Sequence, residues 1–112
     1  MGETLEFQKD EWCIHLTDNI VRLGITYQLQ EDIGKIKGAT FSAVGSYILE
    51  NDIICELDAE NFNSRLASPV EGEVLEINER ALRNPETLNS KNPQETWLLL
   101  VRLTKKIHFL DN

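Results

Sequence analysis

The sequence has few of the residues that bind metals or cross-link small secreted domains. It holds 2 cysteines and 2 histidines among 112 residues, with no CxxC or HxxxH spacing. A structural zinc site needs four such ligands at short intervals, so we expect no metal site. Cys13 and Cys55 lie in apolar contexts. One disulfide is arithmetically possible, but buried free thiols, as in a cytosolic protein, are the favoured interpretation.

Basic residues are scarce as well. There are 11 lysines and arginines against 19 aspartates and glutamates, which gives a net charge of −8. Such a surface repels phosphate backbones and anionic lipid, which argues against nucleic acid or membrane as partners. Two explanations of the acidic surface are left: it contacts a protein partner, or the charge only keeps the protein soluble. No apolar run approaches the ~18 residues of a membrane span, and the first residues do not resemble a secretory signal. We therefore expect a cytoplasmic protein.

The sequence lacks the motifs of enzymes that catalyse a reaction by themselves. The sequence has no GxSxG elbow, no phosphate-binding loop and no dinucleotide fingerprint. His15 falls on an expected strand, where a surface or hydrogen-bonded core histidine is the common case. Carboxylates abound, but their spacing singles out no acid–base pair. An enzyme with a carboxylate-lined cleft is a distant alternative, and we expect a non-catalytic module.

The residues that are present favour a small β protein. Of all residues 41% are apolar, which is enough for one packed core. Many short alternating runs with turn formers between them predict a small β-sandwich or barrel with minor helices. Thr26 is a plausible N-cap for a helix that ends at Gly34, and Pro85 suits a second short helical piece over 80–88. The strand-like runs are 11–16, 20–25, 53–57, 65–67, 73–78 and 97–103, and Lys35 and Lys37 are expected on another strand.

A polar stretch, 58–64, separates two of these runs. It is rich in turn formers and joins the strand-like segments 53–57 and 65–67. Two such runs with a polar connection predict a β-hairpin whose tip is exposed to solvent.

Several motifs occur in an order that resembles the glycine cleavage system H protein family. The similarity covers about residues 9–103 without a gap. It implies a mostly β fold, a flattened β-barrel or sandwich hybrid of the lipoyl/biotinyl-domain type with short helices. It also implies an N-terminal extension (1–8), a domain (9–104) and a C-terminal tail (105–112). The motifs are Glu11-Trp12, Gly24-Ile25-Thr26 with its helix and Gly34, Val44-Gly45, Ser68-Pro69-Val70-Glu71-Gly72-Glu73-Val74, Asn78-Glu79, Asn84-Pro85-Glu86, Asn89 and Trp97.

In that family a lysine at the hairpin tip carries lipoic acid, and this arm shuttles an aminomethyl group in glycine decarboxylation. Alignment on Ser68-Pro69-Val70 places Asn61 at the lysine position of the family motif and Asp58 at the position of its glutamate. A carboxamide nitrogen shares its lone pair with the carbonyl, so it cannot be acylated as an amine can. The resemblance implies lipoate as the family's cofactor, but we expect none here.

Two functions follow from the resemblance. The first is a non-lipoylated module that works by protein–protein binding, with a glycine cleavage enzyme, a lipoate-handling enzyme or another copy as candidate partner. The alternative is a functional lipoyl carrier that is modified at Lys35, Lys37 or Lys91, or altered at position 61. The oligomeric state stays open. The expected interaction surface is the hairpin tip, in which Phe62 either packs back or serves as an exposed anchor: Asp58, Glu60, Asn61, Phe62 and Asn63.

Overall fold

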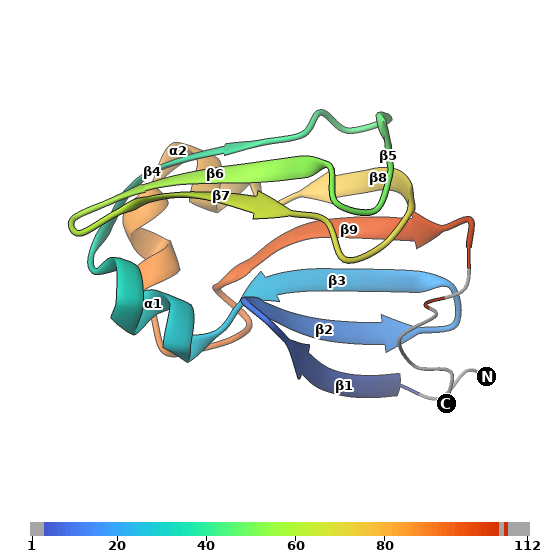
Figure 1. Cartoon of the computed structure of the whole chain (residues 1–112), viewed down its shortest axis with the longest axis horizontal. Coiled ribbons are helices and arrows are strands. Elements are labelled where there is room, and N and C mark those ends of the chain that lie inside the picture. Colours follow the sequence, from blue (N-terminus) through green and yellow to red (C-terminus); the bar gives the residue numbers. More distant parts are fainter. Residues whose placement is uncertain (1–3, 106, 108–112) are drawn as a thin grey trace.

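Two antiparallel sheets face each other in the computed structural model, which describes residues 4–105 and 107 (Figure 1). The larger sheet has the strand order β1-β2-β3-β9-β8-β5 and the smaller one β4-β6-β7. Over the described residues the sheets do not close into one barrel, so the expected lipoyl-type hybrid takes its sandwich form. The elements are β1 (Thr4–Lys9), β2 (Trp12–Thr17), β3 (Ile20–Ile25), α1 (Tyr27–Ile33), β4 (Ile36–Phe41), β5 (Tyr47–Ile48), β6 (Ile53–Ala59), β7 (Asn63–Ala67), β8 (Gly72–Ile77), α2 (Glu79–Arg83), the 3-10 helix η1 (Pro85–Asn89) and β9 (Trp97–Leu103).

The core lies between the sheets and follows the alternation of the strands. In β2, Trp12 and Ile14 are buried, whereas Cys13 and His15 are half-buried on the opposite face. The Trp12 indole N–H donates to the Ala67 carbonyl at 2.9 Å, which ties β2 of one sheet to β7 of the other. Strand pairing thus places one row of apolar side chains inside and leaves the second row on the outer face of the larger sheet.

The two ends of α1 expected from the sequence are confirmed. The Thr26 hydroxyl accepts the Leu29 N–H at 3.1 Å, and Gly34 follows α1 with a φ of +80°. Asn78 caps α2 by accepting the Ala81 N–H at 3.2 Å. Both caps satisfy backbone donors that a helix leaves unpaired in its first turn.

Most strand predictions are also confirmed, and β9 is a central strand between β3 and β8, as its apolar pattern indicated. Two strands were not anticipated: β1 and the short β5. Residues 4–9, most of the expected N-terminal extension, pair with β2 from Thr4↔Thr17 to Lys9↔Trp12. The domain limits themselves stay a prediction, and His108 lies outside the described residues.

The cysteine prediction is correct in part. Both thiols are free. Cys55 is buried on β6, where loss of water contact, and secondarily the negative charge of Glu56, raises its pKa far above the ordinary value. Cys13 is only half-buried, because it lies on the outer face of β2. In the part of the chain that the structure describes, no helix is long and apolar enough to cross a membrane.

Candidate functional site

The candidate site is the tip of the β6–β7 hairpin, which projects at one end of the sandwich beside α1 (Figure 1). The strand register pairs Asp58 with Asn63, so the turn between them carries Glu60, Asn61 and Phe62. All five predicted residues are exposed and lie together. The prediction of an exposed hairpin tip is therefore confirmed.

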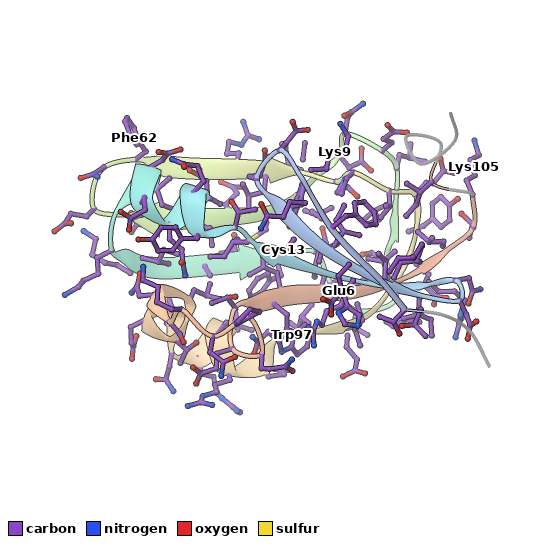
Figure 2. All side chains as sticks on the ribbon, turned by 90° about the horizontal axis from the view of Figure 1, so that it is seen from below. Glu6, Lys9, Cys13, Phe62, Trp97 and Lys105 are labelled. Carbon is purple, nitrogen blue, oxygen red and sulfur yellow. The ribbon has the colours of Figure 1, made fainter. Side chains whose placement is uncertain are left out.

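Phe62 is the most exposed large apolar side chain of the described residues. Its exposed fraction is 61%, and its ring extends away from the ribbon (Figure 2). Of the two interpretations left open by the sequence, the structure supports the exposed one. An aromatic ring inside a polar rim has the composition of an interface anchor.

The turn is fixed by the connection between α1 and β4. The Glu60 N–H donates to the Lys35 carbonyl at 2.9 Å, and the Asn61 N–H donates to the Ile33 carbonyl at 2.8 Å. The Asn61 side chain also donates, through Nδ2, to the Asp32 carbonyl at 3.5 Å. The last carbonyls of a helix have no partner within the helix. The Asn61 backbone N–H therefore caps the C-terminal end of α1, and its carboxamide makes only a long hydrogen bond at the same end.

Gly34 lets the Asn61 carboxamide lie against the end of the helix. A Cβ atom at Gly34 would stand 3.0 Å from Asn61 Nδ2 and 3.1 Å from Asn61 Cγ. The side chain thus lies directly over the glycine backbone. The residue at the turn is exposed, yet its polar group is held against the protein.

Two lysines lie nearer to the tip than the sequence indicated. Lys35 and Lys37 belong to the segment that runs into and along β4, and both are exposed. β4 pairs with β6, and the Lys35 carbonyl bonds directly to the turn. By contrast, the Lys91 ammonium is 3.7 Å from a Glu31 carboxylate oxygen and 4.3 Å from the centre of the Tyr27 ring, at α1.

A shallow hollow of about 250 Å³ adjoins the tip on the outer face of the smaller sheet. Asp58 and Asn63 line it together with Glu56 and Arg65, which are cross-strand partners. Sequence reasoning missed Arg65. Counting the hairpin register outward from the tip would have placed it beside the site, because side chains of one face recur at every second residue.

The structure places neither a metal-binding group nor a histidine at the tip, among the residues that it describes. Among the described residues, no group of three or more His, Cys, Asp or Glu side chains is placed to hold a metal ion. The Nδ1 atom of His15 is 3.0 Å from a Glu6 carboxylate oxygen, on the outer face of the larger sheet. The tip offers amide, carboxylate and aromatic groups, which suit recognition rather than metal binding.

The sandwich with an exposed hairpin defines a protein of the lipoyl-domain class. Its fold is similar to that of a glycine cleavage system H protein from Mycobacterium marinum, with a TM-score of 0.80 over 93% of this chain and 86% of that one, at 24% identity.

Sequence comparison narrows this class. The family model described as glycine cleavage H-protein matches residues 5–110. A probable glycine cleavage system H protein of Thermococcus gammatolerans is 36% identical over 97 residues, which cover 86% of this chain and 72% of the relative. A glycine cleavage system H-like protein of Chlamydia pneumoniae is 34% identical over 92 residues, 82% and 80% of the two chains. The chain belongs to the glycine cleavage H-protein family.

Proposed function

We propose that this family member is not lipoylated and acts as a non-catalytic module that binds another protein through its hairpin tip. The observation that carries the proposal is the residue at the turn. Asn61 presents a carboxamide, and its Nδ2 atom donates to the Asp32 carbonyl at the end of α1. The carboxamide also lies over Gly34, so the Asn61 side chain is held against the end of α1.

The chemistry of acylation supports the absence of a lipoyl group at Asn61. Lipoyl attachment needs a primary amine that loses a proton and attacks an activated acyl carbon. The Asn61 nitrogen is an amide nitrogen, so its lone pair is delocalised into the carbonyl. Without a covalent arm at the tip, the module has no cofactor and no carrier chemistry, and the contribution of the tip is its binding surface.

The tip has the composition of a small interface. Phe62 supplies an exposed aromatic ring, and Asp58, Glu60 and Asn63 surround it with polar groups. Aromatic residues inside a polar rim dominate the energetics of many interfaces. The candidate partners are the enzymes of glycine cleavage and of lipoate handling, since the similar proteins are named for the first of these systems. The cytoplasmic location, and the exclusion of nucleic acid and membrane, stay predictions.

A second candidate function is a lipoyl carrier that uses Lys35. Its carbonyl accepts the Glu60 N–H of the turn, and the side chain is exposed. Within the described residues its ammonium has no carboxylate partner. The Lys35 amine, directly before the strand that pairs with β6, therefore favours the carrier function.

Intact-mass analysis separates the two functions. The full chain is co-expressed with a lipoate ligase, next to the variants Asn61→Lys and Lys35→Arg. We expect no added lipoyl mass on the natural chain and one on Asn61→Lys, since that substitution restores the amine at the turn. A lipoyl mass on the natural chain that Lys35→Arg abolishes would instead establish the carrier function.

The binding role is tested with purified glycine cleavage and lipoate-handling enzymes. Phe62→Ala is compared with Leu49→Ala, because Leu49 is also half-exposed (50%) and directly follows β5, at the other end of the sandwich (Figure 1). Truncation of an interface anchor costs about 2 kcal/mol or more, a roughly 30-fold loss of affinity. An equal effect of the two substitutions would exclude the tip as the contact.

A further inference from the structure

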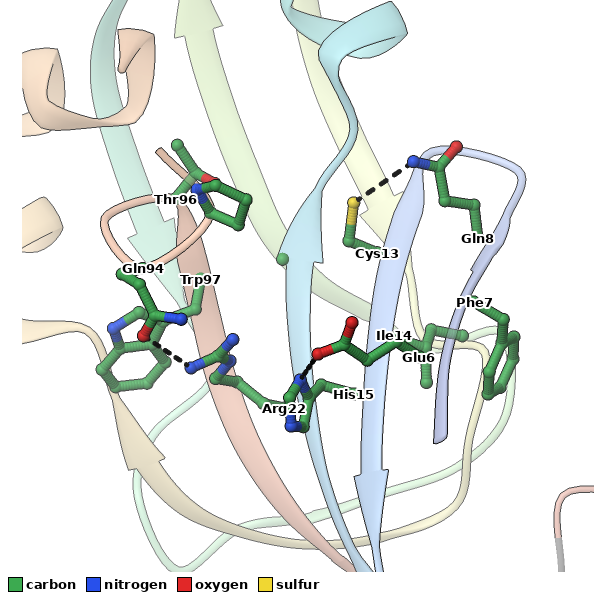
Figure 3. Close-up of a pocket in the computed structure, with 12 residues that line it drawn as sticks. Glu6, Phe7, Gln8, Cys13, Ile14, His15, Arg22, Gln94, Thr96 and Trp97 are labelled. Carbon is green, nitrogen blue, oxygen red and sulfur yellow. Dashed lines mark hydrogen bonds and ion pairs between the residues drawn. The ribbon is translucent and has the colours of Figure 1, made fainter. Parts of the chain in front are cut away.

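The outer face of the larger sheet holds a second recess, separate from the hairpin tip. It measures about 360 Å³ and lies over β1, β2, β3 and the start of β9, with residues 93–96 as one wall (Figure 3). Pockets for small ligands are typically about 300–1,000 Å³. The recess is thus at the small end of the range for a ligand site.

Strand register arranges the floor of the recess in two rows. The first row is Glu6, His15 and Arg22, which are cross-strand partners of one another in sequence across the sheet. In the second row, Cys13 pairs with Gly24, and Gly24 with Trp97. The first row is ionic, whereas the second carries no charge and has the polar Gln8 at its β1 end, opposite Cys13.

The missing side chain of Gly24 makes room for the neighbouring backbone at the floor of the recess. A Cβ atom there would stand 3.1 Å from the Thr96 carbonyl oxygen and 3.2 Å from the Trp97 Cα atom. Glycine therefore permits the close approach of the strand β9 and its preceding loop.

Arg22 is the group in the recess that points to a ligand. Within residues 4–105 and 107, it is the one half-buried lysine or arginine with no carboxylate within 4.0 Å. Its Nη1 atom makes only a long hydrogen bond, 3.4 Å, to Gln94 Oε1. The neighbouring Glu6 is bound by His15 at 3.0 Å instead.

We propose that this recess binds a small organic carboxylate, with the carboxylate on the Arg22 guanidinium and an apolar body over Gly24 against Trp97. A planar carboxylate matches the guanidinium fork and can accept two parallel N–H bonds. The nearby Glu6 carboxylate repels a dianion more strongly than a monoanion, which favours a carboxylate over a phosphate. The proposal is independent of the function assigned to the hairpin tip.

Cys13 reports occupancy of the recess. It is half-buried there, with Sγ 3.9 Å from Gln8 Nε2, whereas Cys55 is 2% exposed in the core. The rate at which a maleimide labels Cys13 in the folded full chain is measured at fixed pH, and Cys13→Ser assigns the signal. The probes are benzoate, cyclohexanecarboxylate, neutral benzamide and inorganic phosphate, each up to about 10 mM, a range that detects millimolar binding.

We expect both carboxylates to slow labelling saturably, and benzamide and phosphate to have little effect. Arg22→Gln should weaken the protection about tenfold or more, and Arg22→Lys should weaken it less, because it keeps the charge but loses the fork. Arg83→Gln, an exposed arginine of α2 that does not line the recess, is the matched control and should change nothing. Absence of protection by both carboxylates, equal protection by benzamide or phosphate, or full protection of Arg22→Gln would overturn the proposal.

Discussion

Replacement of Gly34 by alanine tests the way in which the hairpin tip is anchored. Gly34 has φ +80° and ψ −164°, a backbone region used almost only by glycine. Its substitution also inserts a methyl group 3.0 Å from Asn61 Nδ2 and 3.2 Å from Glu60 Cβ. Both effects act at the junction of α1, β4 and the turn.

The expected cost has two parts. The backbone conformation costs of order 1–3 kcal/mol for a residue with a Cβ atom. The contact with Asn61 adds about 0.5–1 kcal/mol, since the carboxamide must swing away and gives up its bond to Asp32. A total of about 1.5–4 kcal/mol corresponds to a fall in melting temperature of roughly 6–17 °C for a domain of this size.

Urea unfolding of four chains separates the two parts. These are Gly34→Ala, Asn61→Ala, the double variant, and Gly45→Ala as control. Gly45 has φ +89°, but a Cβ atom there meets nothing within 4 Å, so its substitution reports positive φ without a clash. We expect Gly34→Ala to cost more than Gly45→Ala. Its cost should also fall by about 0.5–1 kcal/mol in the Asn61→Ala background, because the pair is coupled.

The result that would refute this reasoning is additivity. If Gly34→Ala costs the same with and without the Asn61 side chain, the carboxamide does not lie over the glycine. A cost below about 0.5 kcal/mol would in addition contradict the backbone argument. Either result would remove the structural reason for regarding Asn61 as a cap rather than a free side chain.

Three further predictions concern the core. Trp12→Phe should lower the free energy of unfolding by about 1–3 kcal/mol in urea, because it leaves the Ala67 carbonyl without its 2.9 Å donor; an unchanged value would show that this bond contributes nothing. Asn89→Ala should lower the free energy of unfolding, measured by calorimetry, by about 1–3 kcal/mol. The Asn89 side chain accepts the Ile36 N–H at 2.7 Å and donates to the Ile36 carbonyl at 3.1 Å. Asn63→Ala removes an exposed side chain and should lower it little. Burial raises the pKa of the Cys55 thiol above its ordinary value of 9.0, so the unfolded chain loses that proton first and stability falls as the pH rises above about 9. Between pH 8 and pH 10 the natural chain should lose about 1.4 kcal/mol more than Cys55→Ala, and parallel pH profiles would contradict the burial of the thiol.

The sequence by itself determined the features that depend on neighbours in the chain. Thr26 begins α1 because its hydroxyl accepts an N–H of the first turn, and Gly34 ends the helix because glycine tolerates a positive φ. Both effects involve residues less than one helical turn apart. The alternation of apolar residues likewise predicted most strands, and the polar stretch between two of them predicted the exposed tip. Motif order was enough to indicate the family, which the family model over residues 5–110 confirms.

Only the tertiary structure decided which distant residues meet. Strand β1 was missed because an edge strand with mostly exposed side chains shows little hydrophobic signal, and its pairing with β2 supplies the order. The bond between Lys35 and Glu60 and the rows formed by Glu6, His15 and Arg22 depend on sheet register. Register is fixed by long-range packing of the whole sandwich, and no local pattern encodes it.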